Sequence, residues 1–212
     1  MNQIIPTVFS TNKEKFDERF NKLVKISKDI QIDFMDGYFV GNESILLKRL
    51  PNLKKYKINF EIHLMAKNPE KYIDEAKKLG FKKIIFHYES LWDNKNCLSL
   101  IKKIKSLKMK AFIALSPETS SSKITPLLKS IDGVLLMGVH PGAEHQEIIP
   151  RTYAKIKEIR KYSKTLPIQI DGGVNLATLK KLKESGATIF NSGSFISNSS
   201  DPKKALKQLE ND

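Results

Sequence analysis

The stretch Ile30-Gln31-Ile32-Asp33-Phe34-Met35-Asp36-Gly37 predicts how this chain folds. Its apolar residues alternate with polar ones, which is the period of a β-strand, and the Asp-Gly pair that follows is typical of a turn. Asp33 is therefore expected near the carboxyl end of a strand. Similar stretches at residues 60–65 and 168–173 carry a histidine and a second aspartate. Two aspartates and a histidine, each at a strand end, are the groups that a metal-assisted acid–base site needs.

Strand-like runs alternate with helix-like runs along the whole chain. The expected strands are residues 4–9, 30–34, 59–64, 83–87, 111–115, 133–137, 168–170 and 188–191. The expected helices are residues 12–28, 46–50, 69–80, 96–107, a ragged segment up to 129, then 151–162, 175–185 and one that begins at 201. This α/β order predicts a (β/α)8 TIM barrel, a single domain over residues 1–212. A doubly wound open sheet is the alternative, because the pattern alone cannot prove closure.

The charge of the chain is strongly positive. It has 37 Lys+Arg against 23 Asp+Glu among 212 residues, a formal net charge of +14. The lysines are spread over nearly every expected helix, which indicates solvated outer faces. Attraction of anionic, phosphorylated substrates is a second interpretation. No basic block with interleaved aromatic residues is present, so the sequence argues against nucleic acid as a partner.

The sequence also limits the cellular setting. Cys97 is the only cysteine, so no internal disulfide can form. Residues 1–6 lack the charged and long apolar regions of a signal peptide. No apolar run approaches the ~20 residues of a membrane span. We therefore expect a cytoplasmic protein without a membrane partner, and a homo-oligomer is compatible with the sequence.

Polar side chains gather at the expected strand ends. Read in chain order, they are Thr7 or Ser10, Asp33, Asp36, His63, His87, Ser116, the loop 137–146, Asp171, and residues 192–194. Taken singly, Asp33 could be a turn carboxylate and His63 a hydrogen-bonded core histidine. The active sites of TIM barrels lie at the carboxyl ends of the strands, so the shared polarity favours a catalytic face.

Two glycine-containing segments are candidates for binding a phosphate group. Gly172 and Gly173 follow the seventh expected strand, and Gly193 and Ser194 follow the eighth. Glycine lets backbone N–H groups approach an anion, and a short helix after the eighth strand would add its positive end. Phosphate commonly binds at this place in TIM barrels.

Short motifs spread along the chain match one known family. They are residues 5–10 (IPTVFS), 33–40 (DFMDGYFV), 63–65 (HLM), 86–89 (FHYE), 139–142 (VHPG), 171–174 (DGGV) and 193–194 (GS). Through these motifs the chain resembles the ribulose-phosphate 3-epimerases over essentially its whole length, as a divergent member.

The resemblance implies an isomerase of the pentose phosphate pathway that interconverts D-ribulose 5-phosphate and D-xylulose 5-phosphate. In the family, the positions of Asp33 and Asp171 form the acid–base pair at carbon 3. One removes a proton, and the other returns it on the opposite face. A divalent metal ion (zinc, iron, manganese or magnesium) bound by these aspartates and His63 would stabilise the enediolate oxygens.

The resemblance also implies a set of residues that bind a small sugar phosphate. They are Thr7, Met35, His63, Met65, Gly142, Gly172, Gly173, Gly193 and Ser194. The methionines, together with Met137, are expected as polarisable pocket walls, and ordinary core packing is an equal alternative for Met137. Thr7 stands where the family usually has serine, which preserves the hydroxyl group.

The chain departs from the family at Gln31. The family has a histidine two residues before the first catalytic aspartate, and it is the fourth metal ligand. An amide oxygen can coordinate a metal but binds zinc-like ions more weakly than imidazole does. We expect either Gln31 as a fourth ligand through its oxygen or water in its place. Both predict a loosely held metal, and coordination by the Gln31 oxygen would also shift the preference from zinc toward magnesium, manganese or iron.

A second departure lies in the loop after the sixth expected strand. Residues 141–146 read Pro-Gly-Ala-Glu-His-Gln, where the family usually reads Pro-Gly-Phe-Gly-Gly-Gln. Replacing two glycines by Glu144 and His145 removes backbone freedom from a segment that closes over substrate in the family. It also puts a carboxylate near the expected phosphate.

Three functions remain open from the sequence. The first is a working pentose-phosphate 3-epimerase. The second is a related 3-epimerase for a hexulose phosphate such as allulose 6-phosphate. The third is a weakly active or inactive relative with a binding role. The retention of Asp33, His63 and Asp171 together favours an enzyme, whereas Gln31 and the altered loop favour the third hypothesis.

Overall fold

The predicted TIM barrel is confirmed. The computed structural model describes residues 2–142 and 146–212. Within these ranges the parallel strands close a barrel in chain order. The strands are β1 (Gln3–Val8), β2 (Asp29–Met35), β3 (Asn59–Met65), β4 (Lys83–His87), β5 (Lys110–Leu115), β6 (Gly133–Met137), β7 (Ile168–Asp171) and β8 (Ile189–Ser192). An open sheet is excluded because β1 pairs with β8, from Gln3 beside Ile189 to Pro6 beside Ser192.

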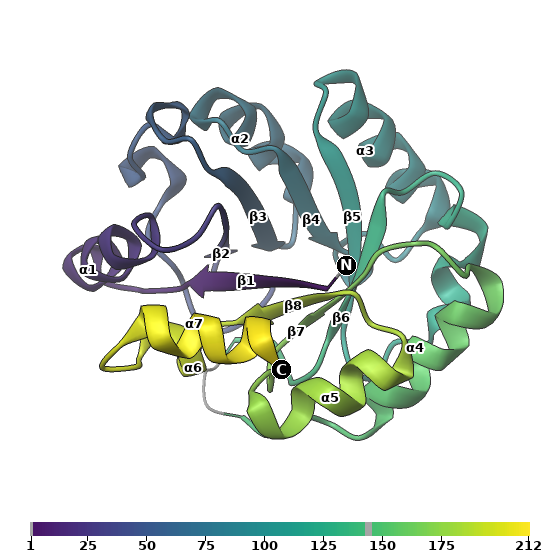
Figure 1. Ribbon diagram of the computed structural model, residues 1–212. Coiled ribbons are helices and arrows are strands. Elements are labelled where there is room, and N and C mark those ends of the chain that lie inside the picture. The colour runs from purple at the N-terminus through teal and green to yellow at the C-terminus, as the bar shows by residue number, and fades with distance from the viewer. Residues whose placement is uncertain (1, 143–145) are drawn as a thin grey trace.

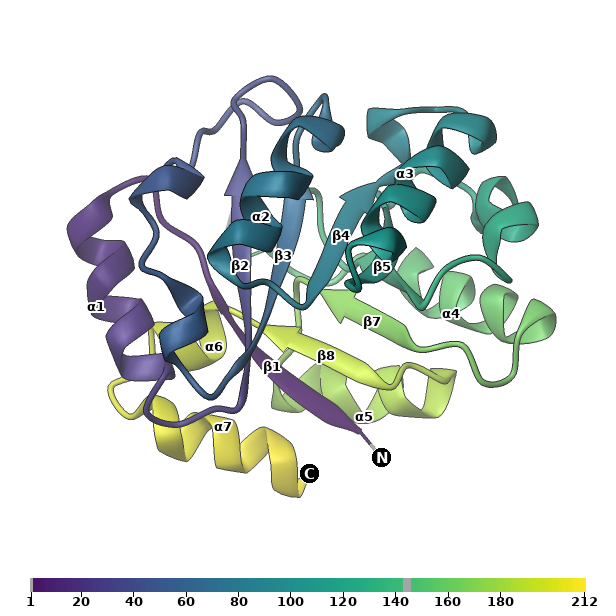
Figure 2. The same ribbon diagram turned by 90° about the horizontal axis from the view of Figure 1, so that it is seen from above.

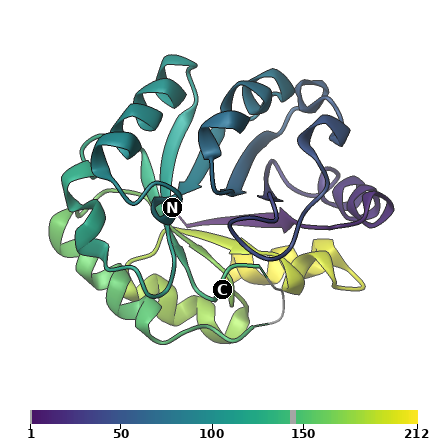
Figure 3. The ribbon, with the colours of Figure 1, turned by 180° about the vertical axis from the view of Figure 1, so that it is seen from behind.

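Helices surround the barrel as an outer layer (Figures 1 and 3). The α-helices are α1 (Lys13–Leu23), α2 (Ile73–Leu79), α3 (Asn94–Ser106), α4 (Arg151–Tyr162), α5 (Leu176–Ser185), α6 (Ser194–Ser197) and α7 (Pro202–Asn211). The 3-10 helices are η1 (Leu47–Arg49), η2 (Leu53–Lys55), η3 (Pro69–Tyr72), η4 (Tyr88–Ser90) and η5 (Ser121–Leu127). None of the helices in the described ranges is long and apolar enough to cross a membrane.

Three helical segments differ from the sequence prediction. The first helix ends at Leu23 instead of continuing to residue 28. The Ser27 hydroxyl donates to the Asp29 carbonyl oxygen at 2.7 Å and fixes the turn into β2. The segments expected as helices near residues 46–50 and before 129 are the 3-10 helices η1 and η5. Pro126 lies within η5 and lacks an N–H donor, which interrupts regular helical hydrogen bonding.

Local capping explains where several helices begin and end. The Asn12 side chain accepts hydrogen bonds from the first-turn N–H groups of α1. Asn175 and Thr178 form a capping box at the start of α5. Gly186 ends α5 with φ of +108°, a conformation that glycine adopts without a steric cost. These caps satisfy backbone groups that the helix itself leaves unpaired.

The barrel separates two regions of buried side chains. The larger core lies between the strands and the helices, as in the cluster of Phe16, Phe20 and Phe60. Inside the barrel, apolar residues such as Phe112 and Leu135 form a smaller core. The barrel interior also contains buried polar residues from β2, β3, β7 and β8, namely Gln31, Glu61, Gln169 and Asn191. The interior of the barrel therefore holds both an apolar cluster and a cluster of buried polar side chains.

The two ends of the described chain lie together. Asn2 and Glu210 line the same surface depression, along with residues at the start of β2. Figure 2 shows the end of α7 close to the start of β1. Because β1 begins here, this is the amino end of the barrel.

Truncating a core ring should weaken the fold. Phe20 is 1% exposed and its ring lies 5.4 to 5.8 Å from those of Phe16, Tyr56 and Phe60. Phe20→Ala should lower the free energy of unfolding by about 3–5 kcal/mol, measured by urea denaturation. The exposed control Tyr162→Ala should change it by no more than about 0.5 kcal/mol. A loss below about 1 kcal/mol for Phe20→Ala would contradict this assignment of the core.

Candidate active site

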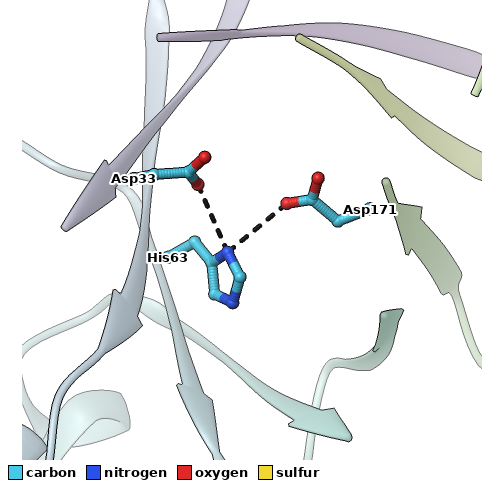
Figure 4. A group of neighbouring side chains, drawn as sticks. All are labelled: Asp33, His63 and Asp171. Carbon is cyan, nitrogen blue, oxygen red and sulfur yellow. Dashed lines mark hydrogen bonds and ion pairs between the residues drawn. The ribbon is translucent and has the colours of Figure 1, made fainter. Parts of the chain in front are cut away.

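Three predicted residues meet at the carboxyl ends of the strands. Asp33 on β2 lies beside His63 on β3 in the strand register, and Asp171 ends β7. The Nδ1 atom of His63 is 3.2 Å from Oδ1 of Asp33 and 3.3 Å from Oδ2 of Asp171. Figure 4 shows both carboxylates pointing toward this nitrogen. Their potential ligand atoms lie within 4.8 Å of one another.

This group fits a divalent metal ion. It offers two carboxylate oxygens and one imidazole nitrogen, a donor set that zinc, iron and manganese accept and whose oxygens suit magnesium. Two carboxylates also supply the negative charge that a cation would offset. The predicted ligands Asp33, His63 and Asp171 are therefore brought together by the fold.

Burial and mutual charge perturb the proton equilibria of the site. Burial and the neighbouring Asp171 carboxylate raise the pKa of Asp33 to about 6. Burial alone would lower the pKa of His63, but hydrogen bonds to Asp171 and Asp33 outweigh it and raise that pKa to about 9. In the absence of a metal ion, His63 is therefore protonated at neutral pH.

A buried chain of side chains orients His63 from behind. Its Nε2 atom lies 2.9 Å from Nε2 of His87, whose Nδ1 lies 3.1 Å from Oε2 of Glu89. Burial raises the pKa of Glu89, but the hydrogen bond and charge of His87, together with hydrogen bonds from Thr119 and Ser116, outweigh burial and lower the pKa. An ionised carboxylate only accepts, so His87 donates to Glu89 and accepts from His63. This arrangement leaves Nδ1 of His63 facing Asp33 and Asp171, as expected for a metal-binding histidine.

Gln31 presents a different atom from the one predicted. Its Nε2 donates to Oδ1 of Asp33 at 2.8 Å and to Oδ2 of Asp171 at 2.5 Å. Its Oε1 accepts from Nδ2 of Asn191 at 2.8 Å. The amide oxygen expected as a metal ligand is thus turned away from the carboxylates.

A cavity of about 420 Å³ opens above the three residues. Its lining includes every predicted substrate-binding residue: Thr7, Met35, His63, Met65, Gly142, Gly172, Gly173, Gly193 and Ser194. Met137 lines it as well. The Oγ1 atom of Thr7 is buried and has no hydrogen-bond partner among the described residues. Buried hydroxyl groups are normally paired, so this oxygen is ready to bind a polar ligand group.

The two glycine segments approach the cavity with their backbones. Gly172 and Gly173 have φ of +94° and +73°, which favours glycine. A Cβ atom on Gly172 would lie 2.4 Å from Val139, and one on Gly173 would lie 2.8 Å from Ile148. Larger residues are therefore excluded here. The predicted short helix after the eighth strand is present as α6, which begins at Ser194.

Comparison with known proteins identifies the family. The family model described as "Ribulose-phosphate 3 epimerase family" matches residues 3–197. The chain belongs to this family. The proteins named ribulose-phosphate 3-epimerase in Bacillus subtilis and Schizosaccharomyces pombe are 31% and 28% identical to it. Each alignment covers 99% of this chain, with 98% of the first relative and 92% of the second. The predicted family and enzyme class, an isomerase, are confirmed.

Solved structures with little sequence identity share the fold of this epimerase-family chain. One is titled "Crystal Structure of 3-Hexulose-6-Phosphate Synthase", with a TM-score of 0.75, 16% identity, and coverage of 100% of this chain and 99% of that one. Another, titled "Crystal structure of KGPDC from Streptococcus mutans", has a TM-score of 0.73, 13% identity, and coverage of 100% and 96%. At these identities the likeness shows the fold alone, a TIM barrel.

The loop that departs from the family pattern is described only at its two ends. Gly142 and Gln146 line the cavity, and the Gly142 carbonyl oxygen accepts from Asn42 at 2.6 Å. Residues 143–145 lie outside the described residues. The expected effect of Glu144 and His145 on phosphate binding therefore stays a prediction.

Sequence reasoning missed the polar residues inside the barrel. Glu61, Gln169 and Asn191 lie beneath the site, and Asn191 also lines the cavity. Their signal was a polar residue within a strand whose neighbours are apolar. His87 was noted at a strand end, but its contact with His63 was not predicted.

The proton on His63 can be tested directly. In the metal-free protein its imidazole should titrate with a midpoint near 9, followed by NMR of the ring protons, because its hydrogen bonds to the carboxylates favour the charged form. Asp171→Asn should lower that midpoint. His63→Gln assigns the signal by removing it. A midpoint at or below the ordinary value of about 6.5 would contradict the described hydrogen bonds.

Proposed function

We propose that this chain interconverts D-ribulose 5-phosphate and D-xylulose 5-phosphate by inverting carbon 3. The observation that carries the proposal is the placement of two carboxylates, from β2 and β7, at the floor of one cavity. They belong to Asp33 and Asp171, the predicted acid–base pair. The family match supports the same reaction.

The chemistry requires one group that accepts a proton and one that donates a proton. The hydrogen on carbon 3 is weakly acidic because it lies next to a carbonyl group. An ionised carboxylate removes it and leaves an enediolate. The other carboxyl group, in its protonated form, donates to the opposite face of the same carbon. The raised pKa of Asp33, about 6, helps one member of the pair to carry a proton.

A divalent metal ion fits this mechanism. Asp33, His63 and Asp171 would hold it. When bound, it supplies positive charge that stabilises the enediolate oxygens. The contact of His63 with His87 orients the His63 imidazole, so this ring does not have to reorganise during the reaction.

The rest of the cavity suits a sugar phosphate. Backbone N–H groups at Gly172, Gly173 and the start of α6 would bind the phosphate, and the net charge of +14 would attract it. The unpartnered Thr7 hydroxyl would bond to a substrate hydroxyl. Met35 and Met65 would form apolar walls.

An epimerase assay tests the proposal. Ribulose 5-phosphate should be converted to xylulose 5-phosphate with added Mn²⁺, and in D₂O deuterium should enter at carbon 3. The panel should include allulose 6-phosphate. Preferred turnover of that compound would identify a hexulose-phosphate epimerase instead. No exchange with any ketose phosphate under any divalent metal would leave only the binding role.

The two carboxylates can be tested one at a time. Asp33→Asn and Asp171→Asn should each lower kcat by at least about 100-fold, because the amide cannot transfer a proton as a carboxylate does. Asp29→Asn is a matched control at the opposite end of β2, where it contacts Asn59 rather than the cavity. It should retain activity. A folded Asp33→Asn protein with near-normal kcat would contradict the acid–base role.

A further inference from the structure

A hydrogen-bonded network of buried polar side chains crosses the barrel interior beneath the active site. It runs from Lys83 on β4 through Glu61 on β3, Gln169 on β7 and Asn191 on β8 to Gln31 on β2. All but Lys83 are at most 4% exposed. Unpaired polar groups are costly in such a place, so the hydrogen bonds of this network constrain one another.

The charged pair Lys83 and Glu61, at one end of this side-chain network, determines which groups donate and which accept along it. Glu61 only accepts hydrogen bonds and Lys83 only donates them. Lys83 lies 2.5 Å from Oε2 of Glu61 and donates to Oε1 of Gln169 at 3.2 Å. The Nε2 atom of Gln169 consequently faces Oε1 of Glu61, and it also donates to Oδ1 of Asn191 at 2.6 Å. Charged partners thus set the orientation of the Gln169 amide, and Nδ2 of Asn191 in turn lies 3.4 Å from Oε1 of Glu61.

The same network determines the orientation of the Gln31 amide. The Nδ2 atom of Asn191 donates to Oε1 of Gln31 at 2.8 Å, and Nε2 of Gln169 lies 3.3 Å from the same oxygen. The nitrogen of Gln31 must then face the active-site carboxylates. A reversed amide would set its oxygen against two carboxylate oxygens and its N–H groups against two other N–H groups. The two orientations are therefore far from equivalent.

We propose that Gln31 is a positioning residue that donates to both catalytic carboxylates, and that the divalent ion at this site has only three protein ligands. Gln31 and His63 contact the same two oxygens, Oδ1 of Asp33 and Oδ2 of Asp171. Donation from Gln31 offsets the repulsion of two buried like charges and fixes their separation. Asp33, His63 and Asp171 would hold the ion without a ligand from Gln31.

The contribution to catalysis rests on the proposed function, whereas the orientation of the amide does not. The tests of orientation therefore use Mn²⁺ or NMR without substrate. If they succeed and no ketose phosphate reacts, the proposed function fails and this inference stands.

Releasing the Gln31 oxygen should strengthen metal binding. Asn191→Leu removes the nearer of the two N–H groups that hold this oxygen away from the site and leaves only the longer contact with Gln169, so the amide can turn toward the ion. Calorimetric titration with MnCl₂ should show affinity about threefold or more higher than in wild type, as expected for neighbours in one network. The gain should vanish in the Asn191→Leu, Gln31→Met double variant. Unchanged or weaker binding in Asn191→Leu would overturn the proposal.

The wild-type protein provides a test that needs no variant to fold. The side-chain NH₂ protons of Gln31 should show nuclear Overhauser contacts to the His63 ring and should exchange slowly with water. The exposed Gln208 amide is the reference for fast exchange. Overhauser contacts of Gln31 NH₂ only with the Asn191 side chain would show the reversed amide and refute the assignment.

The positioning role has a kinetic signature. At saturating Mn²⁺, Gln31→Met should lower kcat by about tenfold or more with little change in KM, because the carboxylates lose their fixed separation while the substrate contacts remain. Gln208→Met, on the outer face of α7, should match wild type in both parameters. Equal kcat values for Gln31→Met and wild type would exclude a role in positioning.

Discussion

The site depends on holding two largely buried carboxylates of like charge close together. Asp33 and Asp171 come from β2 and β7, which are separated by more than half of the chain, and they meet only because β1 and β8 pair. Their side chains are only 12% and 13% exposed, so their repulsion must be offset by hydrogen-bond donors or cations. His63 and Gln31 both donate to this pair. Closure of the barrel thus brings together both the two repelling carboxylates and the donors that stabilise them.

Two side-chain hydrogen-bond networks orient these donors, and each network ends at a further carboxylate. Glu89 fixes His87 and through it His63, whereas Glu61 fixes the amides that lead to Gln31. Each carboxylate can only accept hydrogen bonds, so the neighbouring imidazole or amide must donate to it. Because imidazole and amide groups can both donate and accept, this fixes the orientation of the next group in the network. The remaining interior of the barrel is packed with apolar residues such as Phe112 and Leu135.

The sequence predicted the barrel because strands and helices have different periods and these alternate along the whole chain. It also predicted Asp33, His63 and Asp171, since polar residues at strand ends collect on one face of a parallel barrel. It could not predict which atom Gln31 presents. An amide carries a donor and an acceptor of nearly equal size, and the choice between them depends on Glu61, Gln169 and Asn191. These residues lie on three other strands, so their meeting is a consequence of closure rather than of any local pattern.

The two ends of the described chain lie side by side at the amino end of the barrel, away from the cavity. A short peptide could join them, and new ends could be opened in a surface loop, without altering the order of strands around the barrel. The same placement lets the protein be tethered to a solid support through either end while the cavity faces the surrounding solution. The cavity and the two chain ends thus occupy opposite ends of the barrel.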